Sequence, residues 1–402
     1  MIDFFERKLL GQHGIEFEEA AEVARWEALS FYLTLLAGRR SVSFSYPSSL
    51  DNGELMPNSF FDRLGLTPLK APPDTKIVSS VKERRMVVLR TQESPSDDMV
   101  LAPARVQYAV ELNRENSPHY DEYDGVIGVP FEPGDRRWSA SQLTAIGQCG
   151  FRWFAQRVLK LEPVEEIELG MDYTKRGTFY HKVLELAVSR AMAEGDIRAA
   201  TLQHLDAAFA EAEKSPDAAV PTLLNWDLQR AEHIGALRKA VESVEFISDG
   251  ARVIGLEQMF EETWNGFRLI GYIDRVDETP DGLIAIDYKT SSVPPKGAKD
   301  EAGKLTVDVQ IPLYSNVALK KLYPAGTLGN SVYYSLVKGK VLRAEKEDDF
   351  VKLDGLVNRI KKTLADGNFA VDPDADEYAC TYCKFDQVCR KGLRLERKTA
   401  NT

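Results

Sequence analysis

The segment GYIDRVDETPDGLIAIDYKT, residues 271–290, decides the fold that the sequence predicts. Two apolar runs flank its Pro-Asp-Gly turn signal at 280–282, so the segment is expected to form a β-hairpin. Asp274 lies on the first expected strand and Asp287 on the second. Because side chains alternate between the two faces of a strand, Asp287 and Lys289 share one face. The sequence thus predicts an acid and an amine held side by side on a sheet.

These residue types suit the hydrolysis of a phosphodiester. The reaction needs a nucleophilic water and a partner for the charge that builds on the phosphate oxygens, and a hard divalent ion supplies both. Two carboxylates are enough to hold Mg²⁺, and a histidine adds a nitrogen ligand that also suits Mn²⁺. The candidate histidine is His181, in RGTFYHKVLE at residues 176–185. The ammonium of Lys289 would then lower the cost of the developing negative charge.

Each of these residues also has an ordinary structural interpretation. An Asp and a Lys two positions apart at the end of a strand are common, and they usually form a surface salt bridge. A lone histidine such as His181 is more often a partly buried helix residue than a metal ligand. The motifs that surround these residues decide between the two interpretations.

Residues 138–390 resemble the nuclease domain of the PD-(D/E)XK superfamily in its RecB-type form. They are most similar to the iron-sulfur form found at the end of the AddB subunit of bacterial double-strand-break repair complexes. One departure is that no proline precedes the first acid, which is followed by Arg275. Five motifs stand in the family order: WSASQLTAIGQCGFRWFAQRVL (138–159) as the first helix, RGTFYHKVLE as the histidine motif, GYIDRVD (271–277) as the first acid, IDYKTS (286–291) as the second acid with its lysine, and DVQIPLY (308–314) as the helix with its glutamine and tyrosine.

The resemblance implies a restriction-endonuclease-like α/β fold, in which helices flank a mixed central sheet. It also implies a bound Mg²⁺ or Mn²⁺ with His181, Asp274 and Asp287 as ligands. The carbonyl of Tyr288 would be a fourth ligand from the protein. Lys289 would be the catalytic lysine.

Three further residues receive expected roles. Gln310 would orient the catalytic lysine, and Tyr314 would contact DNA or pack its helix. These two residues are four positions apart and so share a helix face, which requires Pro312 to lie in the first turn, where its missing N–H costs little. Glu257, on the strand before the Trp-Asn-Gly turn at 264–266, is expected to approach the site.

The four cysteines of the chain indicate a second bound group, separate from the acidic site. Cys149 is distant in sequence from a compact cluster formed by Cys380, Cys383 and Cys389. Scattered core thiols or two disulfides of a secreted protein are the ordinary alternatives. The first ten residues, MIDFFERKLL, lack the basic and apolar regions of a signal peptide, so an intracellular location is expected and disulfides are disfavoured.

A metal centre is the remaining interpretation of the four thiols. Their spacing alone suits structural Zn²⁺ or a [4Fe-4S] cluster equally. The family resemblance implies the [4Fe-4S] cluster, with all four cysteines as ligands. The cluster would be structural, tying the first helix of the nuclease segment to its C-terminal end, and closing so long a loop removes unfolded-state entropy.

Composition sets the wider frame. The chain has 402 residues, of which 44% are hydrophobic, so it can form two or three domains with real cores. No stretch is apolar and long enough to span a membrane, and a cytoplasmic protein is expected. The net charge of −11 does not exclude DNA binding, because whole-chain charge says little about a local groove. Basic residues that would contact phosphate, or else form a solvated helix face and a frayed tail, are Arg152, Arg157, Lys160, Lys384, Arg390, Lys391, Arg394, Arg397 and Lys398.

Three domains are expected from these patterns. Residues 1–67 resemble the remnant of a helicase-like domain, with a helix and then a β-rich run that ends at Pro47. Residues 68–137 form a polar connector. Residues 138–402 form the nuclease domain, with a helical insertion at about 190–250 and the C-terminal cysteine cluster. No phosphate-binding loop occurs, and Leu36-Ala37 replaces the Thr-Arg pair of helicases, so ATPase activity is not expected.

The function predicted from the sequence is that of a Mg²⁺- or Mn²⁺-dependent deoxyribonuclease with a structural [4Fe-4S] cluster. It would act as an exonuclease on DNA ends or single strands in double-strand-break repair and recombination. The alternative is a non-catalytic DNA-binding or scaffold module of a helicase-nuclease complex. In both cases the expected partners are DNA and a helicase subunit, and no membrane is involved.

Overall fold

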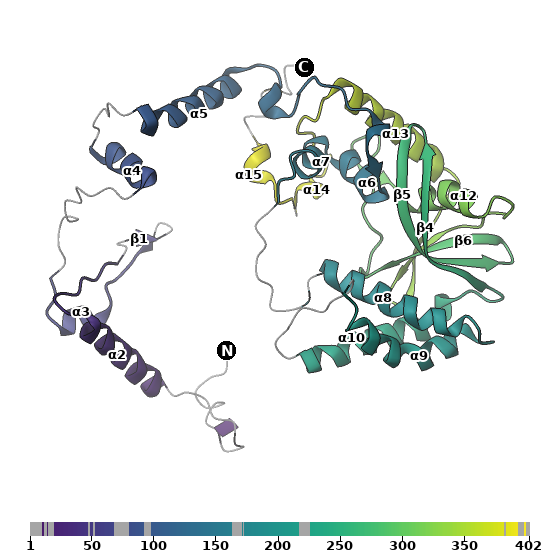
Figure 1. Ribbon diagram of the computed structural model, residues 1–402, viewed down its shortest axis with the longest axis horizontal. Coiled ribbons are helices and arrows are strands. Elements are labelled where there is room, and N and C mark those ends of the chain that lie inside the picture. The colour runs from purple at the N-terminus through teal and green to yellow at the C-terminus, as the bar shows by residue number, and fades with distance from the viewer. Residues whose placement is uncertain are drawn as a thin grey trace. The chain divides into compact units, whose positions relative to one another are not determined.

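The computed structural model describes twelve stretches of the chain, and its elements are drawn in Figure 1. The described residues are 10–11, 14, 20–46, 49–50, 53–67, 80–91, 98–162, 171, 173–216, 226–381, 383–392 and 398. The chain divides into two compact units, Met1–Pro103 and Ala104–Thr402. Within the described residues, no helix is both long enough and apolar enough to cross a membrane.

Stacked aromatic rings hold the first unit together. Phe31 lies 5.1 Å from Phe44 and 4.9 Å from Phe60 between ring centroids, and Phe44 lies 5.3 Å from Phe61. The β-rich run expected before Pro47 is not a strand over residues 41–46. None of the described strands pairs with it, and its Phe44 packs into this aromatic cluster. The elements are α2 (Ala20–Ala37), β1 (Ser49–Leu50), β2 (Gly53–Glu54), α3 (Ser59–Arg63) and α4 (Val81–Thr91), and α5 (Asp98–Asn116) crosses the boundary between the units.

A six-stranded mixed sheet forms the centre of the second unit. The strand order is β10-β9-β6-β5-β3, and β4 also pairs with β5. The β3–β5 and β6–β9 pairs are parallel, and the other pairs are antiparallel. The predicted mixed sheet flanked by helices is therefore confirmed. The strands are β3 (Arg137–Trp138), β4 (Arg252–Trp264), β5 (Phe267–Thr279), β6 (Gly282–Lys289), β9 (Val332–Ser335) and β10 (Lys340–Ala344).

The predicted hairpin is the pair β5 and β6. Thr279 lies opposite Gly282, so the connection is a two-residue loop of Pro280 and Asp281. Gly282 has a φ of 124°, and a Cβ added there would lie 2.7 Å from the carbonyl oxygen of Thr327. Only glycine satisfies both the backbone angle and the close approach, so this position fixes the sharp return of the chain.

Three long helices cover one face of the sheet, as Figure 1 shows. They are α8 (Tyr173–Ala191), α9 (Ile197–Ala212) and α10 (Trp226–Glu242). Their apolar sides bury a core against Ile284, Ile286 and Tyr288, which alternate along β6. The side chain of Asp196 caps α9 by accepting a hydrogen bond from the Ala199 N–H at 3.0 Å. This layer positions the histidine motif over the sheet.

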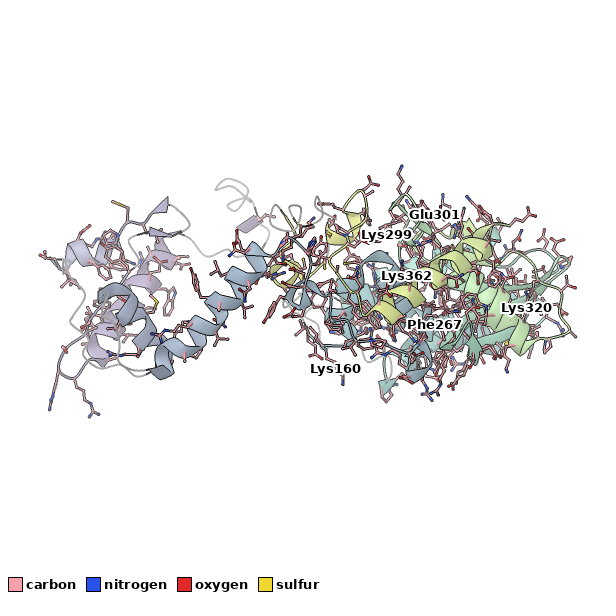
Figure 2. The ribbon with its side chains drawn as sticks, turned by 90° about the horizontal axis from the view of Figure 1, so that it is seen from above. Lys160, Phe267, Lys299, Glu301, Lys320 and Lys362 are labelled. Carbon is pink, nitrogen blue, oxygen red and sulfur yellow. The ribbon has the colours of Figure 1, made fainter. Side chains whose placement is uncertain are left out.

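The opposite face carries a second core, where Trp138 stacks on Trp153 at 5.1 Å and Phe267 is fully buried. Figure 2 labels Phe267 among the side chains of this unit. The single first helix expected at 138–159 is in fact two helices, which meet at Cys149. Cys149 is extended, with φ −159° and ψ 117°, and Gly150 follows it against the backbone of Phe369. The helices of this face are α6 (Ala140–Gln148), α7 (Gly150–Arg157), α11 (Gln310–Leu313) and α13 (Asp349–Asp366).

Short elements complete the second unit. They include a π-helix, Tyr314–Leu319, that continues α11 directly. The others are the 3-10 helices η1 (Glu122–Asp124), η2 (Pro133–Asp135) and η4 (Val244–Phe246), the strands β7 (Ala298–Lys299) and β8 (Leu305–Val307), and the helices α12 (Lys320–Leu322), α14 (Tyr378–Thr381) and α15 (Asp386–Cys389).

Candidate active site

Two carboxylates and an ammonium meet on the β5–β6 hairpin. The register places Arg275 opposite Ile286, so Asp274 lies directly opposite Asp287 and both side chains share a face. Asp274 and Asp287 are 8% and 2% exposed. The Nζ atom of Lys289 lies 2.6 Å from Asp287 Oδ2. The structure therefore brings together the acid pair and lysine that the sequence predicts.

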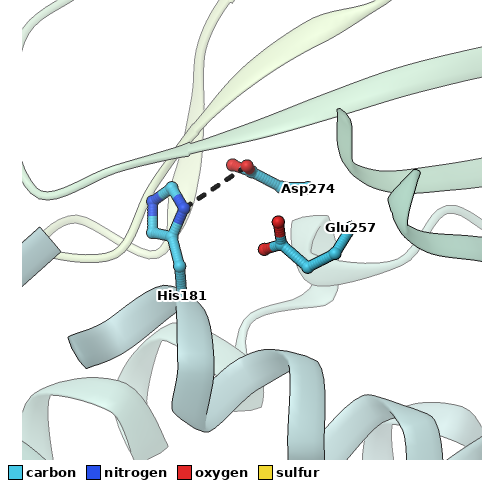
Figure 3. A group of neighbouring side chains, drawn as sticks. All are labelled: His181, Glu257 and Asp274. Carbon is cyan, nitrogen blue, oxygen red and sulfur yellow. Dashed lines mark ion pairs between the residues drawn. The ribbon is translucent and has the colours of Figure 1, made fainter. Parts of the chain in front are cut away.

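Helix α8 delivers His181 to this pair of strands. Its Nδ1 lies 3.3 Å from Asp274 Oδ1, and its Nε2 donates a hydrogen bond to the carbonyl oxygen of Tyr288 at 3.0 Å. The backbone N–H of Tyr288 in turn donates to Asp274 Oδ2 at 2.7 Å. The imidazole thus faces the carboxylate and the carbonyl that the resemblance implies as its fellow ligands, and Figure 3 shows the approach to Asp274.

Glu257 joins the group from strand β4, as expected. The β4–β5 register pairs Leu256 with Arg275 and Gln258 with Ile273, so Glu257 lies opposite Asp274. Ligand atoms of His181, Glu257 and Asp274 all lie within 4.8 Å of one another (Figure 3). Two carboxylates and an imidazole therefore lie within reach of a shared centre, whereas Asp287 contacts Lys289 and Gln310 beside this group.

Gln310 connects the lysine to the second acid. Its Oε1 accepts a hydrogen bond from Lys289 Nζ at 2.9 Å, and its Nε2 donates to Asp287 Oδ1 at 2.6 Å. The same Nε2 lies 3.0 Å from the hydroxyl oxygen of Tyr314, one turn further along. Tyr314 is buried and packs its ring on Phe260, so packing of the helix is the part of its expected role that its position fits.

The site concentrates negative charge away from water. Burial raises the pKa of Asp287 to about 6, although the neighbouring lysine opposes the shift. Burial and then Asp274 raise the pKa of Glu257 to about 7. For His181, burial lowers the pKa, but Asp274 together with the other acids outweighs it and raises the pKa to about 9. Such a group of acids needs protons or a cation to balance it.

The donor set fits a hard divalent ion. Carboxylate oxygens, a backbone carbonyl and one imidazole are ligands that Mg²⁺ and Mn²⁺ accept. Asp287 Oδ2 is buried and, within the part of the chain that the structure describes, accepts no hydrogen bond. The ammonium of Lys289 forms an ion pair with this oxygen at 2.6 Å, which leaves the oxygen a second lone pair. This oxygen therefore has an acceptor position to offer a metal ion.

A buried arginine supports the strands from the other face, and sequence reasoning missed this role. Arg275 is 1% exposed and donates two hydrogen bonds of 2.9 Å to the carboxylate of Asp277. Its Nη1 also donates to the hydroxyl of Tyr288 at 2.9 Å. Tyr288 supplies both the N–H that holds Asp274 and the carbonyl that faces His181, so Arg275 fixes it. The only sign of this role in the sequence is that an arginine occurs among the apolar residues of a strand expected to be buried.

The four cysteines gather around a small apolar cluster. Cys149, Cys383 and Cys389 pack against Phe151 and its buried neighbours, and all four thiols are free and partly buried. Burial and then the nearby thiols raise the pKa of Cys389. For Cys380, burial is again the main cause of a raised pKa, and Lys391 opposes it. The structure thus brings Cys149 close to the three cysteines at the other end of the second unit.

The basic residues at the C-terminal end are largely engaged within the chain. Arg390 pairs with Glu111 and Lys391 pairs with Glu377. Lys398 is 4% exposed and pairs with the buried Asp124, which agrees with neither of the two alternatives for this residue, phosphate contact or a frayed tail. Arg394 and Arg397 lie outside the described residues, whereas Arg157 and Lys160 are exposed.

Comparison with known proteins adds one match. The family model described as PD-(D/E)XK nuclease superfamily matches residues 137–390, more than half of the 402 residues. The matched stretch contains His181, both hairpin acids, Lys289 and all four cysteines. Among curated proteins, no match to the chain is found.

Proposed function

Because the chain belongs to the PD-(D/E)XK nuclease superfamily, we propose that it is a metal-dependent DNA nuclease acting as an exonuclease on ends or single strands. The observation that carries the proposal is the contact of Lys289 with Asp287 and Gln310, beside Asp274 and His181. A hydrolytic site needs these groups to be held in place before substrate binds. Hydrogen bonds and burial hold them here.

His181, Asp274, Asp287 and the carbonyl of Tyr288 would hold the divalent ion, with Glu257 as an additional carboxylate at its side. When bound, Mg²⁺ or Mn²⁺ supplies a nucleophilic water and neutralises charge on the phosphate. The hydrogen bond from the Tyr288 N–H to Asp274 fixes the orientation of that carboxylate. Burial of the acids keeps competing water away from them.

Lys289 acts on the charge that develops during the reaction. As water oxygen bonds to phosphorus, the bond from phosphorus to the leaving oxygen breaks, and negative charge grows on the phosphate oxygens. The ammonium stabilises this charge, and a proton must reach the leaving oxygen. Gln310 holds the ammonium by one amide atom and Asp287 by the other, so it aligns two reacting parts of the site.

Cleavage of linear DNA in the presence of Mn²⁺ tests the proposal. The wild-type protein should cut, and Lys289→Ala should lose at least 100-fold in rate, a loss typical of removing a group that stabilises the transition state. Lys338→Ala, an exposed lysine on the turn after β9, is the matched control and should retain activity. No cleavage by wild type, or equal cleavage by Lys289→Ala, would instead favour a non-catalytic DNA-binding or scaffold module.

The four cysteines would hold a structural [4Fe-4S] cluster, as in the AddB-type proteins that the sequence resembles. The gathering of Cys149 with the C-terminal thiols supports a bound centre. Protein prepared without oxygen should be brown, with absorbance near roughly 400 nm, the region expected for thiolate-ligated iron. A colourless protein with one zinc per chain would refute the cluster.

A place in double-strand-break repair and recombination follows from the same likeness, with a helicase subunit as the partner. In this proposal residues 1–67 derive from a helicase-like domain, residues 68–137 connect it, and residues 138–402 form the nuclease domain. Helices α9 and α10 would be the insertion. Co-purification of a helicase with the tagged full-length chain from its own cells is the direct check.

A further inference from the structure

A third acid, Asp308, lies just outside the group of candidate ligands. It is 8% exposed and precedes α11, the helix that carries Gln310. Its Oδ1 accepts hydrogen bonds from the N–H groups of Gln310 and Ile311, at 3.1 Å and 3.4 Å. The same oxygen accepts a hydrogen bond from the hydroxyl of Tyr333 at 2.8 Å. One carboxylate oxygen therefore holds two different elements, α11 and β9.

Both of these elements touch Lys289. The first contact is the hydrogen bond from Lys289 Nζ to Gln310 Oε1 at 2.9 Å. The second is the ring of Tyr333, whose centroid lies 5.2 Å from the same Nζ, within the range of a cation–π interaction. The parallel β6–β9 register places Tyr333 beside Asp287, which explains why its ring reaches the lysine. The Lys289 ammonium is thus held between a side-chain amide and an aromatic face.

Asp308 is itself fixed by a buried ion-pair network. Its Oδ2 pairs with the guanidinium of Arg343 on β10. Arg343 Nη2 donates to both carboxylate oxygens of Asp349, each at 2.7 Å, and Asp349 is 1% exposed. Asp349 also accepts the Lys346 N–H at 2.8 Å. The network ties Asp308 to the start of α13, so this carboxylate cannot move independently of the sheet and helix around it.

We propose that Asp308 is a positioning residue that sets the place of the Lys289 ammonium through Gln310 and Tyr333 at once. The inference rests on the proposed function for the role of the lysine. Asp308 touches neither the candidate ligands nor Lys289 in the described contacts, so it acts only through its two neighbours. Displacement of a catalytic group by about 1 Å can lower the rate by about 100-fold, so loss of this carboxylate should lower kcat.

Tyr333→Phe is the sharpest variant, because it keeps the ring beneath the lysine and removes only the hydroxyl bonded to Asp308. Its matched control is Tyr334→Phe, the next residue on β9. Tyr334 is 1% exposed and donates to the carbonyl of Ala240 at 2.6 Å on the other side of the sheet. Both variants lose one buried hydrogen bond and should lose similar thermal stability. Only Tyr333→Phe should lower kcat, by about tenfold, the effect of one hydrogen bond.

Asp308→Asn should lower kcat further, by about 100-fold, with KM for DNA and Mn²⁺ affinity unchanged. The ¹⁵N resonance of the Lys289 ammonium, assigned with Lys289→Arg, gives a readout that does not depend on turnover. It should shift in Tyr333→Phe and stay in place in Tyr334→Phe.

The outcomes separate the two proposals. Wild-type kcat in both Tyr333→Phe and Asp308→Asn would overturn the positioning role and leave the nuclease function standing. If the wild-type protein cuts no DNA, the proposed function fails. The positioning role of Asp308 is then tested by the ammonium resonance alone. An unchanged resonance in Tyr333→Phe then refutes positioning by Asp308, and a shift confined to that variant supports it.

Discussion

Glu257 adopts a backbone conformation that side-chain-bearing residues seldom occupy, with a φ of 45° in the middle of strand β4. Such local strain persists where the surrounding structure enforces it, and it often accompanies a functional position. Here it accompanies a carboxylate that stands beside Asp274 and His181. The strained backbone of Glu257 therefore lies at the candidate metal centre.

Glu257→Gln should weaken Mn²⁺ binding by about tenfold, in the range seen when groups that support a metal site are removed. The amide keeps the size of the side chain and removes its charge. Calorimetric titration of Mn²⁺ measures the change. Glu261→Gln, an exposed acid on the same strand that pairs with Arg137, is the control and should bind as the wild type does. Equal affinities of the two variants would contradict the prediction.

His233 should make stability depend on pH below neutrality. Burial, and then the charge of Arg176, lowers the pKa of His233, whose Nδ1 lies 2.7 Å from the Tyr180 hydroxyl. The folded state therefore binds fewer protons than the unfolded state at acid pH. Its contribution to stability is complete above the unfolded pKa of 6.5 and is lost as pH falls toward the folded pKa.

Denaturant unfolding of metal-free protein between pH 7 and pH 5 measures this effect, the range being set by a reference pKa of about 6.5. His233→Gln should flatten the decline in unfolding free energy over that range. His204→Gln provides the comparison, since His204 pairs with Glu194 at the surface. An unaltered slope in His233→Gln would show that other groups cause the decline.

The sequence could identify those site residues that lie within local motifs. His181, Asp274, Asp287, Lys289 and Gln310 lie together in the structure. Strand alternation predicted only that Asp287 and Lys289 share a face, and the family resemblance implied the meeting with His181 and Gln310. Asp308, Tyr333 and Arg343 could not be identified in the same way. Their meeting depends on the pairing of β6 with β9, whose paired residues are 46 positions apart in the sequence, and no local spacing encodes that pairing.

At the scale of elements, the stability of the protein should be highly sensitive to substitution in the hairpin turn. Gly282→Ala should lower the unfolding free energy by about 3 kcal/mol, because it combines an unfavourable φ with a clash against backbone atoms of Thr327 and Gly329. Gly266→Ala is the matched control: its φ is 82°, but the space around it is open, so the expected loss is about 1 kcal/mol. Thermal unfolding of both variants measures the difference, and equal losses would mean that the clash is relieved.

The break between α6 and α7 was not visible in the sequence. The family resemblance implied one helix at 138–159, and the structure divides it at Cys149. The physical reason is tertiary, since the extended cysteine and the close approach of Gly150 to Phe369 bring the thiol toward the C-terminal cysteines. Packing here overrides local helix propensity.

If the four thiols hold the proposed metal centre, Cys149→Ala should lower the stability of the metal-loaded protein by about 3 kcal/mol, since the centre would close a long loop. After the centre is removed by chelation under reducing conditions, the same substitution should cost much less. Calorimetric unfolding of both forms gives the two values. Full stability of Cys149→Ala in metal-loaded protein would rule out the structural role of the centre.

At the scale of the whole molecule, the buried clusters around the sheet all lie in the second unit. A fragment of residues 98–402, which keeps α5 whole, should fold alone and retain Mn²⁺ affinity. The fragment keeps the pair of Arg114 with the buried Asp124, which ties α5 to this unit. Calorimetry should show that the fragment unfolds at the temperature of one transition of the full chain. Failure of the fragment to bind Mn²⁺ would mean that the first unit supports the site.

The separation of the four thiols along the chain has a consequence for biosynthesis. The hairpin with Asp274 and Asp287 is local and can pair as soon as it leaves the ribosome, whereas Cys149 must wait for Cys389, 240 residues further along the chain. Contacts at such long sequence separation form late in folding. A nascent chain would therefore already carry its acidic hairpin while its thiols are still apart, and the centre proposed for these thiols would form only after the hairpin.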